Sequence, residues 1–341
     1  KCRSSSGIGC GWVLNPAGSG EMETREFMDQ SIALMASEEM RKFWVCIREA
    51  AGFHLSSAEC KPFLAFHRFV TEPEPQFITA WRADPKKERW YRLLVNGVGN
   101  VESSFACVRY HQERVRSIEA AAHACFEDAG VRDRLGSATV GGGNTLALDF
   151  EYQAYVLAYR RCLDHLARAL AAYFRNDQHS FRQLPKLLAK AKPRLVAEAI
   201  YAVIGRHSTN FEFVLSAPGA NSVRDRIAHY EFVPAGVLNI SARGFVLMGG
   251  GEEIGLDASP TLLRDVLTRR TGELFACISE LLSRFVAEVA TNEVNQLKAT
   301  AGPMSSDVPQ LGRTSNTAND SQVACPGTTI AAARQAAEGS P

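Results

Sequence analysis

Residues 152–173 read YQAYVLAYRRCLDHLARALAAY, and their large apolar side chains recur every three or four positions. That spacing places them along one wide stripe of a helix, which a folded protein buries. The stripe consists of Tyr152, Tyr155, Val156, Tyr159, Leu163, Leu166, Leu170 and Tyr173. We therefore expect a helix over about 147–175, with its tyrosines in the core rather than forming a surface for stacking bases.

The same period extends to the other long segments and predicts an all-α fold. Helical spacing of apolar residues covers 22–52 and 260–292. Asp84-Pro85 offers a cap followed by a first-turn proline, which starts a helix running to about 128. We expect strain in that helix at Gly97 and Gly99, because glycine weakens a helix interior.

Two other segments depart from the long helices. Residues 237–248 hold two apolar runs around Ala242-Arg243-Gly244, which predicts one small β-hairpin before the last helix. Four prolines between residues 62 and 85 predict a linker that contains a short helix at 63–70.

Composition changes at both ends of the chain. The first 20 residues are rich in Gly and Ser, and residues 300–341 lack aromatic side chains. We predict a disordered segment at 1–20, a helical region with a Pro-rich linker at 21–84, a helical domain at 85–295 and a disordered tail at 296–341.

Charge and cysteine usage narrow the class of protein. The 38 Lys and Arg residues nearly balance 37 Asp and Glu residues, so any polyanion site has to be a local patch. Nine scattered cysteines without a C-x-x-C pair are typical of reduced thiols in a cytoplasmic protein. We expect no metal, no cofactor, no signal peptide and no membrane span, and we expect Asp164 and His165 at the surface.

The run Asn221-Ser-Val-Arg-Asp-Arg-Ile-Ala-His-Tyr230 carries the candidate chemistry. Arg224 is a permanent cation whose planar fork of donors suits a phosphate group. His229 can take and give a proton near neutral pH. Asp225 lies four residues before His229 on a helix, where it is expected to orient the imidazole. Another interpretation is a solvated turn of charges in which Asp225 pairs with Arg226 or His229.

The Arg-x-x-x-x-His spacing, with a polar residue after the Arg, resembles the active-site motif of the HEPN superfamily, which includes many metal-independent ribonucleases of toxin and antiviral systems. Over about 85–292 the resemblance implies a HEPN-like helical bundle and a homodimer in which the Arg and His of each copy face a shared cleft. It further implies attack of the ribose 2′-oxygen on the adjacent phosphate, so that RNA is cut and DNA is spared.

One position departs from a regulated subgroup of that superfamily. Some of its toxins carry a Tyr two residues after the His, which a partner nucleotidyltransferase modifies. Glu231 stands there in this chain and Tyr230 stands one place earlier, which argues against that subgroup. The predicted hairpin is likewise an addition to the simple bundle.

A basic stretch lies upstream of the motif. Between residues 182 and 206 one acidic residue, Glu198, accompanies six basic ones: Arg182, Lys186, Lys190, Lys192, Arg194 and Arg206. Lys190, Lys192 and Arg194, together with Arg226 in the motif, are the predicted phosphate contacts. A solvated helix face that binds nothing explains the same charges.

Two functions follow from these patterns. The first is a metal-independent endoribonuclease in which Arg224 holds the scissile phosphate, His229 is the acid and base, and Asp225 assists; RNA and an antitoxin or regulatory protein are its expected partners. The second is a non-catalytic HEPN-like dimer that acts as a binding or scaffold protein. A solvent-open cleft around Arg224 and His229 favours the enzyme, and burial in separate salt bridges favours the scaffold.

Overall fold

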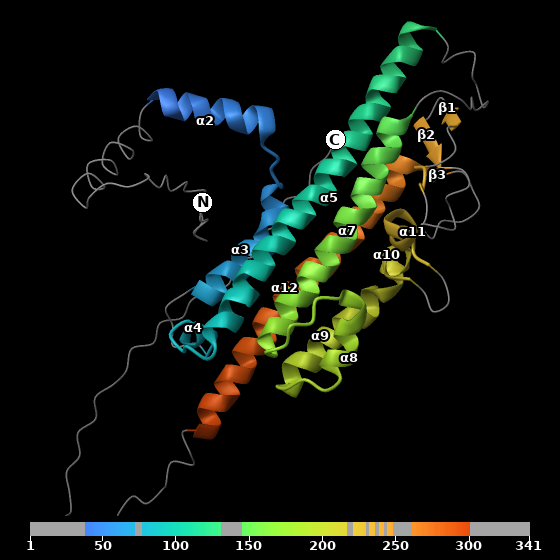
Figure 1. Cartoon of the computed structure of the whole chain (residues 1–341). Helices are drawn as coiled ribbons and strands as arrows, with labels where there is room; N and C mark the ends of the chain where they lie inside the picture. Colours follow the sequence, from blue (N-terminus) through green and yellow to red (C-terminus); the bar gives the residue numbers. More distant parts are fainter. Residues whose placement is uncertain are drawn as a thin grey trace, which may run out of the picture. The chain divides into compact units, whose positions relative to one another are not determined.

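The computed structural model describes residues 38–71, 77–130, 145–216, 221–229, 232–235, 239–241, 244–247 and 261–300. These residues are mostly helical, as the all-α prediction requires (Figure 1). The predicted disordered segment at 1–20 lies outside the described residues, as does the predicted tail from residue 301 onward. Residues 296–300 differ from that prediction, because they form the last turn of a helix.

Three long helices lie side by side at the centre of the fold: α5 (Glu88–Asp128), α7 (Leu146–Tyr173) and α12 (Leu263–Thr300). The predicted stripe of α7 is buried along its whole length. The hydroxyl groups of Tyr155 and Tyr159 donate to the carbonyl oxygens of Leu267 and Arg270 in α12, at 3.3 and 3.1 Å. Tyr155 and Tyr159 therefore pack apolar rings in the core while their hydroxyl groups keep hydrogen-bond partners.

Helices α5 and α7 pack tightly at Gly97. A Cβ atom added to Gly97 would lie 2.8 Å from the Cβ of Ala169 and 2.9 Å from its Cα, closer than folded proteins tolerate. Gly99 has nothing within 4 Å of the same position. The two glycines, predicted as points of strain, therefore differ: α5 continues through both, and only Gly97 is needed for close packing.

The predicted proline-rich linker is largely helical. Helix α3 (Ser57–Thr71) runs through Pro62, and α4 (Phe77–Trp81) follows it. Five residues of this region are buried in the same core as the long helices: Phe63, Phe66, Val70, Ile78 and Trp81. The free energy gained by burying these large side chains outweighs the loss of the backbone hydrogen bond that Pro62 cannot donate. The positions of the prolines in the sequence do not reveal this burial. Helix α2 (Glu38–Ala51) lies within the predicted helix at 22–52.

Short helices connect α7 to the segment that carries the motif. They are η1 (Phe181–Gln183), α8 (Leu184–Leu188), α9 (Arg194–His207), η2 (Ser208–Phe211), α10 (Glu212–Leu215) and α11 (Val223–His229). Helix α9 packs along α12, where Glu280 pairs with both Arg206 and His207. Arg206, the last basic residue of the upstream stretch, thus serves helix packing.

Three short strands precede α12. Strand β1 (Asn239–Ser241) pairs antiparallel with β2 (Gly244–Leu247), and β2 pairs with β3 (Thr261–Leu262). Residues 242 and 243, which would form the turn of the predicted hairpin, lie outside the described residues, so the hairpin stays a prediction.

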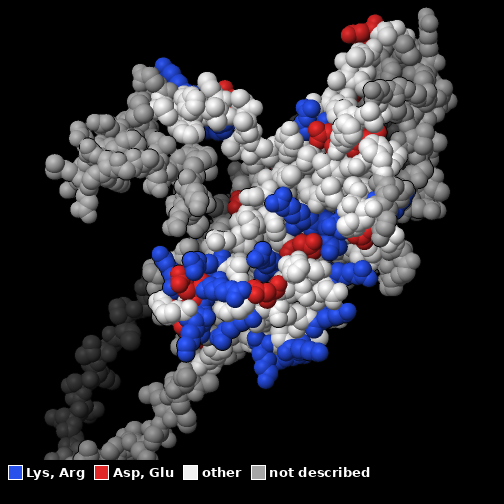
Figure 2. All heavy atoms as spheres, viewed as in Figure 1, with Lys and Arg blue, Asp and Glu red and all other residues white. Residues whose placement is uncertain are grey.

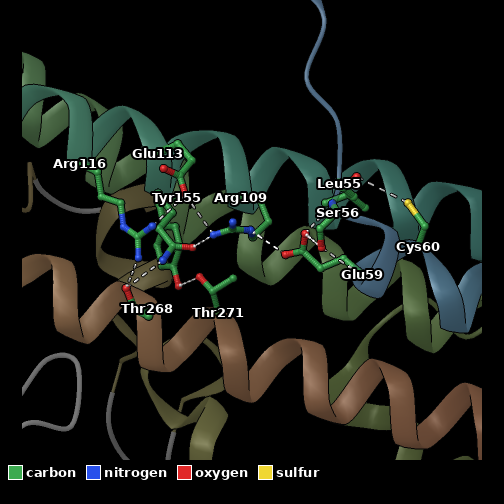
Figure 3. Close-up of polar contacts among 11 residues, drawn as sticks. Leu55, Ser56, Glu59, Cys60, Arg109, Glu113, Arg116, Tyr155, Thr268 and Thr271 are labelled. Carbon is green, nitrogen blue, oxygen red and sulfur yellow. Dashed lines mark hydrogen bonds and ion pairs between the residues drawn. The ribbon is translucent and has the colours of Figure 1, made fainter.

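A polar seam joins α3, α5 and α12 beside the buried Tyr155 (Figure 3). Its centre is Arg109, whose Nε lies 2.8 Å from Glu59 Oε1 and whose Nη1 donates to Gln112 Oε1 at 2.6 Å. Gln112 then donates to Thr268 Oγ1 at 3.0 Å. Partial burial alone would raise the pKa of Glu59, but hydrogen bonds from Ser56 and the charge of Arg109 lower it below its usual value. The seam thus links three helices that are far apart in the sequence.

Candidate active site

Helix α11 is short and depends on its neighbours for its position. Val223 is buried in the core, and Ile227, one turn later, is partly buried and packs against the same core. The Ser222 hydroxyl accepts the backbone N–H of Asp225 at 3.1 Å, which caps the first turn. Seven residues form too short a helix to be stable alone, so packing on α7 and α10 holds it.

Arg224 and Asp225 form an ion pair on this helix. Arg224 Nη1 donates to Asp225 Oδ1 at 2.9 Å, and Ser216 Oγ, just after α10, donates to Asp225 Oδ2 at 2.7 Å. Partial burial would by itself raise the pKa of Asp225, but the hydrogen bonds from Ser216, Arg224 and Ser222 outweigh it and lower the pKa to about 2. Asp225 is therefore a stable anion near neutral pH that fixes the Arg224 guanidinium.

His229 is the last residue of α11, and it is exposed. Five helical steps separate it from Arg224, so the two side chains leave the helix about 140° apart and about 7.5 Å apart along its axis. The structure thus brings Arg224 and Asp225 together, whereas the expected contact of Asp225 with His229 stays a prediction. Tyr230 and Glu231 lie outside the described residues.

The chain just after the motif is fastened to the start of α7. The buried Asp149 accepts the backbone N–H of Ala235 at 2.7 Å, and Gln153 Nε2 donates to the carbonyl oxygen of Val233 at 3.0 Å. Val233 and Ala235 are themselves buried. These contacts fix residues 232–235 on the first turns of α7, three residues beyond His229.

The predicted phosphate contacts lie at two places. Lys190, Lys192 and Arg194 are exposed at the N-terminal end of α9, where Arg194 also pairs with Glu198 at 2.8 Å. Arg226 lies on α11, which follows the other end of α9 through η2 and α10 (Figure 1). The 14 residues of α9 span about 20 Å, and the chain runs along this helix between Lys192 and the motif.

A larger basic surface surrounds that turn. Residues 160–194 contain nine Lys and Arg against two Asp, and Arg160 and Arg89 pair with those two aspartates, Asp164 and Asp177. Seven of the basic residues are exposed and make no ion pair with another described residue: Arg161, Arg168, Arg175, Arg182, Lys186, Lys190 and Lys192. Figure 2 shows Lys and Arg side chains gathered over the part of the molecule that holds α8 and α9.

Sequence reasoning missed the α7 part of this surface. Arg161 and Arg168 lie seven residues apart, which is two helical turns and hence one face of α7. Arg175 follows just beyond the end of this helix, where its φ of 55° breaks the helical path. This spacing of arginines is visible in the sequence, but the more regular spacing of the apolar residues in the same helix drew the prediction to its buried face.

Asp164 and His165 are less exposed than predicted. Asp164 pairs with Arg160 and accepts the backbone N–H of Phe181 at 3.0 Å. His165 Nδ1 lies 2.8 Å from the hydroxyl oxygen of the buried Ser104 on α5. Burial lowers the pKa of His165, so it favours the neutral imidazole. Both residues join helices.

The described residues contain neither a candidate metal site nor a candidate membrane span. Within them, no cluster of three or more His, Cys, Asp and Glu side chains is arranged to hold a metal ion. None of their helices combines the length and apolar character that a membrane crossing requires.

Comparison of the chain with protein-family models, with curated proteins and with solved structures found no match. The site is therefore interpreted from its residues alone.

Proposed function

We propose that this chain is a metal-independent endoribonuclease of HEPN type that cuts RNA with Arg224 and His229. His229 takes the proton of a ribose 2′-hydroxyl, and the 2′-oxygen attacks the adjacent phosphorus. The bond from phosphorus to the 5′-oxygen breaks, and the departing oxygen receives a proton from the imidazolium of His229. The products are a 2′,3′-cyclic phosphate and a 5′-hydroxyl. Arg224 stabilises the charge that builds on the non-bridging oxygens.

The observation that carries this proposal is the pairing of a fixed cation with an exposed imidazole on one anchored helix. Asp225 engages one of the five N–H donors of Arg224, and the Arg224 side chain is about one-third exposed. A phosphate can bind the other donors without breaking that ion pair. The basic surface around α8 and the start of α9 supports binding of the RNA backbone outside the cut.

The same ion pair also favours the second function. Arg224 held by Asp225 is what a non-catalytic binding or scaffold protein would show, because the guanidinium is then part of the fold. A HEPN-like homodimer belongs to both proposals, and in the enzyme it would bring two α11 helices to one cleft. Sedimentation at micromolar concentration tests the dimer, and a purely monomeric chain would remove the shared cleft.

The decisive experiment compares cleavage of single-stranded RNA by the wild-type chain and by His229→Ala. We expect the variant to cut about a hundred- to ten-thousand-fold more slowly, as for loss of an acid–base group. Because His229 is exposed, its melting temperature should stay near wild type. Product ends are identified by mass spectrometry, and a 2′-deoxyribose at the cut should block the reaction.

The matched control is His54→Ala, which removes another exposed histidine far from α11 in sequence. It should cleave like wild type. Cleavage that survives in His229→Ala, or wild-type protein that binds RNA without cutting it, would favour the scaffold function instead.

A further inference from the structure

Two aromatic rings stand exposed together beside the candidate active site. Phe150, in the first turns of α7, is 58% exposed, and Phe232 is 52% exposed. Their ring centroids lie 6.3 Å apart and the rings are nearly perpendicular. Large apolar side chains in contact with each other and with water are costly, so such a pair calls for an explanation other than core packing.

The rings sit on rigid backbone. Phe150 follows Asp149 and precedes Gln153, the two α7 residues that bind the segment 232–235. Phe232 is the residue next to Val233, whose side chain is completely buried. The exposed pair is therefore presented by a fixed frame, and little conformational entropy would be lost when a ligand covers it.

The pair is close to the proposed acid–base residue. Phe232 lies three positions after His229, and even a fully extended chain spans no more than about 11 Å over that distance. An adjacent nucleotide of an RNA whose phosphate lies at His229 would come within reach of the rings.

We propose that Phe150 and Phe232 form a stacking platform for an unpaired nucleobase next to the scissile phosphate. This inference rests on the proposed ribonuclease function and adds how the substrate is selected: the RNA must be single-stranded at the cut so that a base can leave its stack. Aromatic side chains bind single-stranded nucleic acid in this way with little preference for base identity.

The size of the patch favours a base over a second copy of the chain. A stable protein interface buries about 800 Å² on each partner, which is far more than two half-exposed phenylalanines offer. The face of one ring matches the area of a nucleobase, and the second ring, nearly perpendicular to the first, would meet the edge of that base. An interface between copies is nevertheless an outcome that the experiment separates.

The test measures binding of a fluorescent single-stranded RNA by anisotropy, with full-length protein carrying His229→Ala so that cleavage does not consume the probe. Adding Phe150→Ala or Phe232→Ala should weaken the affinity about five- to a hundredfold, the range measured when stacking residues are removed. Phe232→Trp should restore it. Phe43→Ala is the matched control, because Phe43 on α2 is also about half exposed and contacts another ring.

Two further readouts separate stacking from charge. The dependence of the affinity on salt should keep its slope in the Phe variants, whereas Lys190→Ala and Lys192→Ala should reduce it. An RNA with an abasic nucleotide beside the cut should bind the His229→Ala parent with and without Phe232→Ala equally, because the base that the ring would contact is gone.

The outcomes distinguish the two proposals. If the otherwise wild-type chain cuts RNA but the Phe variants bind as tightly as their parent, the platform is wrong and the ribonuclease stands. If the wild-type chain neither binds nor cuts RNA, both fall. If the Phe variants instead change the sedimentation coefficient and leave RNA affinity intact, the patch is an interface between copies and the platform is overturned.

Discussion

The seam around Arg109 and the motif around Arg224 both consist of an arginine bound to a carboxylate, but they differ in what the pair connects. Arg109 on α5 meets Glu59 on α3 and, through Gln112, Thr268 on α12. Arg224 meets the next residue of its own helix. An ion pair between distant helices holds a fold together, whereas a pair between neighbours fixes a side chain and joins no helices.

This difference suggests that Arg109 serves the stability of the fold, whereas Arg224 is placed for binding a ligand. Removing Arg109 would leave partly buried acceptors on two helices, while removing Arg224 would leave Asp225 with its bonds to Ser216 and Ser222. A charged group that the fold does not need for stability, yet holds in place, is a candidate for binding a ligand.

The largest expected effect tests this contrast with two alanine variants. Arg224→Ala should slow RNA cleavage about a hundred- to a thousandfold, the usual loss of a donor to a charged transition state, with less than about 1 kcal/mol lost in unfolding. Arg109→Ala should lower the free energy of unfolding by about 1–3 kcal/mol and leave the cleavage rate of folded protein near wild type. Urea denaturation and a cleavage assay measure both quantities.

A lysine variant sharpens the same comparison. Arg224→Lys should recover only part of the activity, because lysine lacks the planar fork that binds phosphate through two bonds. The contrast is lost if Arg224→Ala unfolds the chain as readily as Arg109→Ala, since Arg224 would then be a structural residue.

An intermediate effect is expected where the long helices that carry the seam meet. Gly97→Ala should destabilise the protein by about 1–3 kcal/mol, because its new methyl group meets the backbone of Ala169. Gly99→Ala, two residues away in open space, should stabilise it by about 0.5–1 kcal/mol through helix propensity. Thermal unfolding of both variants measures the difference, and equal shifts would contradict the close approach.

The smallest expected effect is on the free energy of unfolding at low pH. The pKa of Asp225 is about 2 when folded and near its ordinary value of about 3.8 when unfolded, so the anion stabilises the fold above pH 4. That contribution, about 1 kcal/mol after allowance for solvent screening, is lost as the pH falls from 4 towards 2. Asp225→Asn should flatten this part of the stability curve, measured by urea denaturation at each pH. If the acid limb of the curve is the same in this variant as in wild type, the ion pair does not form in solution.

Much of the fold is readable from the sequence because apolar period and burial coincide. The stripes of 152–173 and 263–285 are buried where their spacing predicts. The helix predicted at 63–70 is confirmed within α3, but the prolines indicated a linker and did not reveal that Phe63 and Phe66 are buried in the core. Burial against helices that are distant in the sequence outweighs the local preference of proline for irregular structure. The local sequence alone does not show which helices will meet.

The sequence predicts which residues of the candidate site could carry its chemistry, but not which residues contact them. Spacing indicated Arg224 and His229 on one short helix, and both lie on α11. Nothing in the sequence places Ser216 on Asp225, because α10 and α11 meet only through the tertiary fold. For the same reason the proximity of Phe150 and Phe232, 82 residues apart, could not be anticipated.

Under the proposed ribonuclease function, the length of α9 predicts a minimum length for the RNA substrate. The basic turn at Lys190 and Lys192 lies at one end of this helix, and the chain leads from its other end to α11. A strand of stacked nucleotides advances about 3.4 Å per residue, so about six nucleotides cover the roughly 20 Å that α9 measures. Oligonucleotides shorter than this footprint would contact one end at a time. Under the proposed ribonuclease function, the shortest RNA that is cut efficiently should therefore be about six nucleotides long.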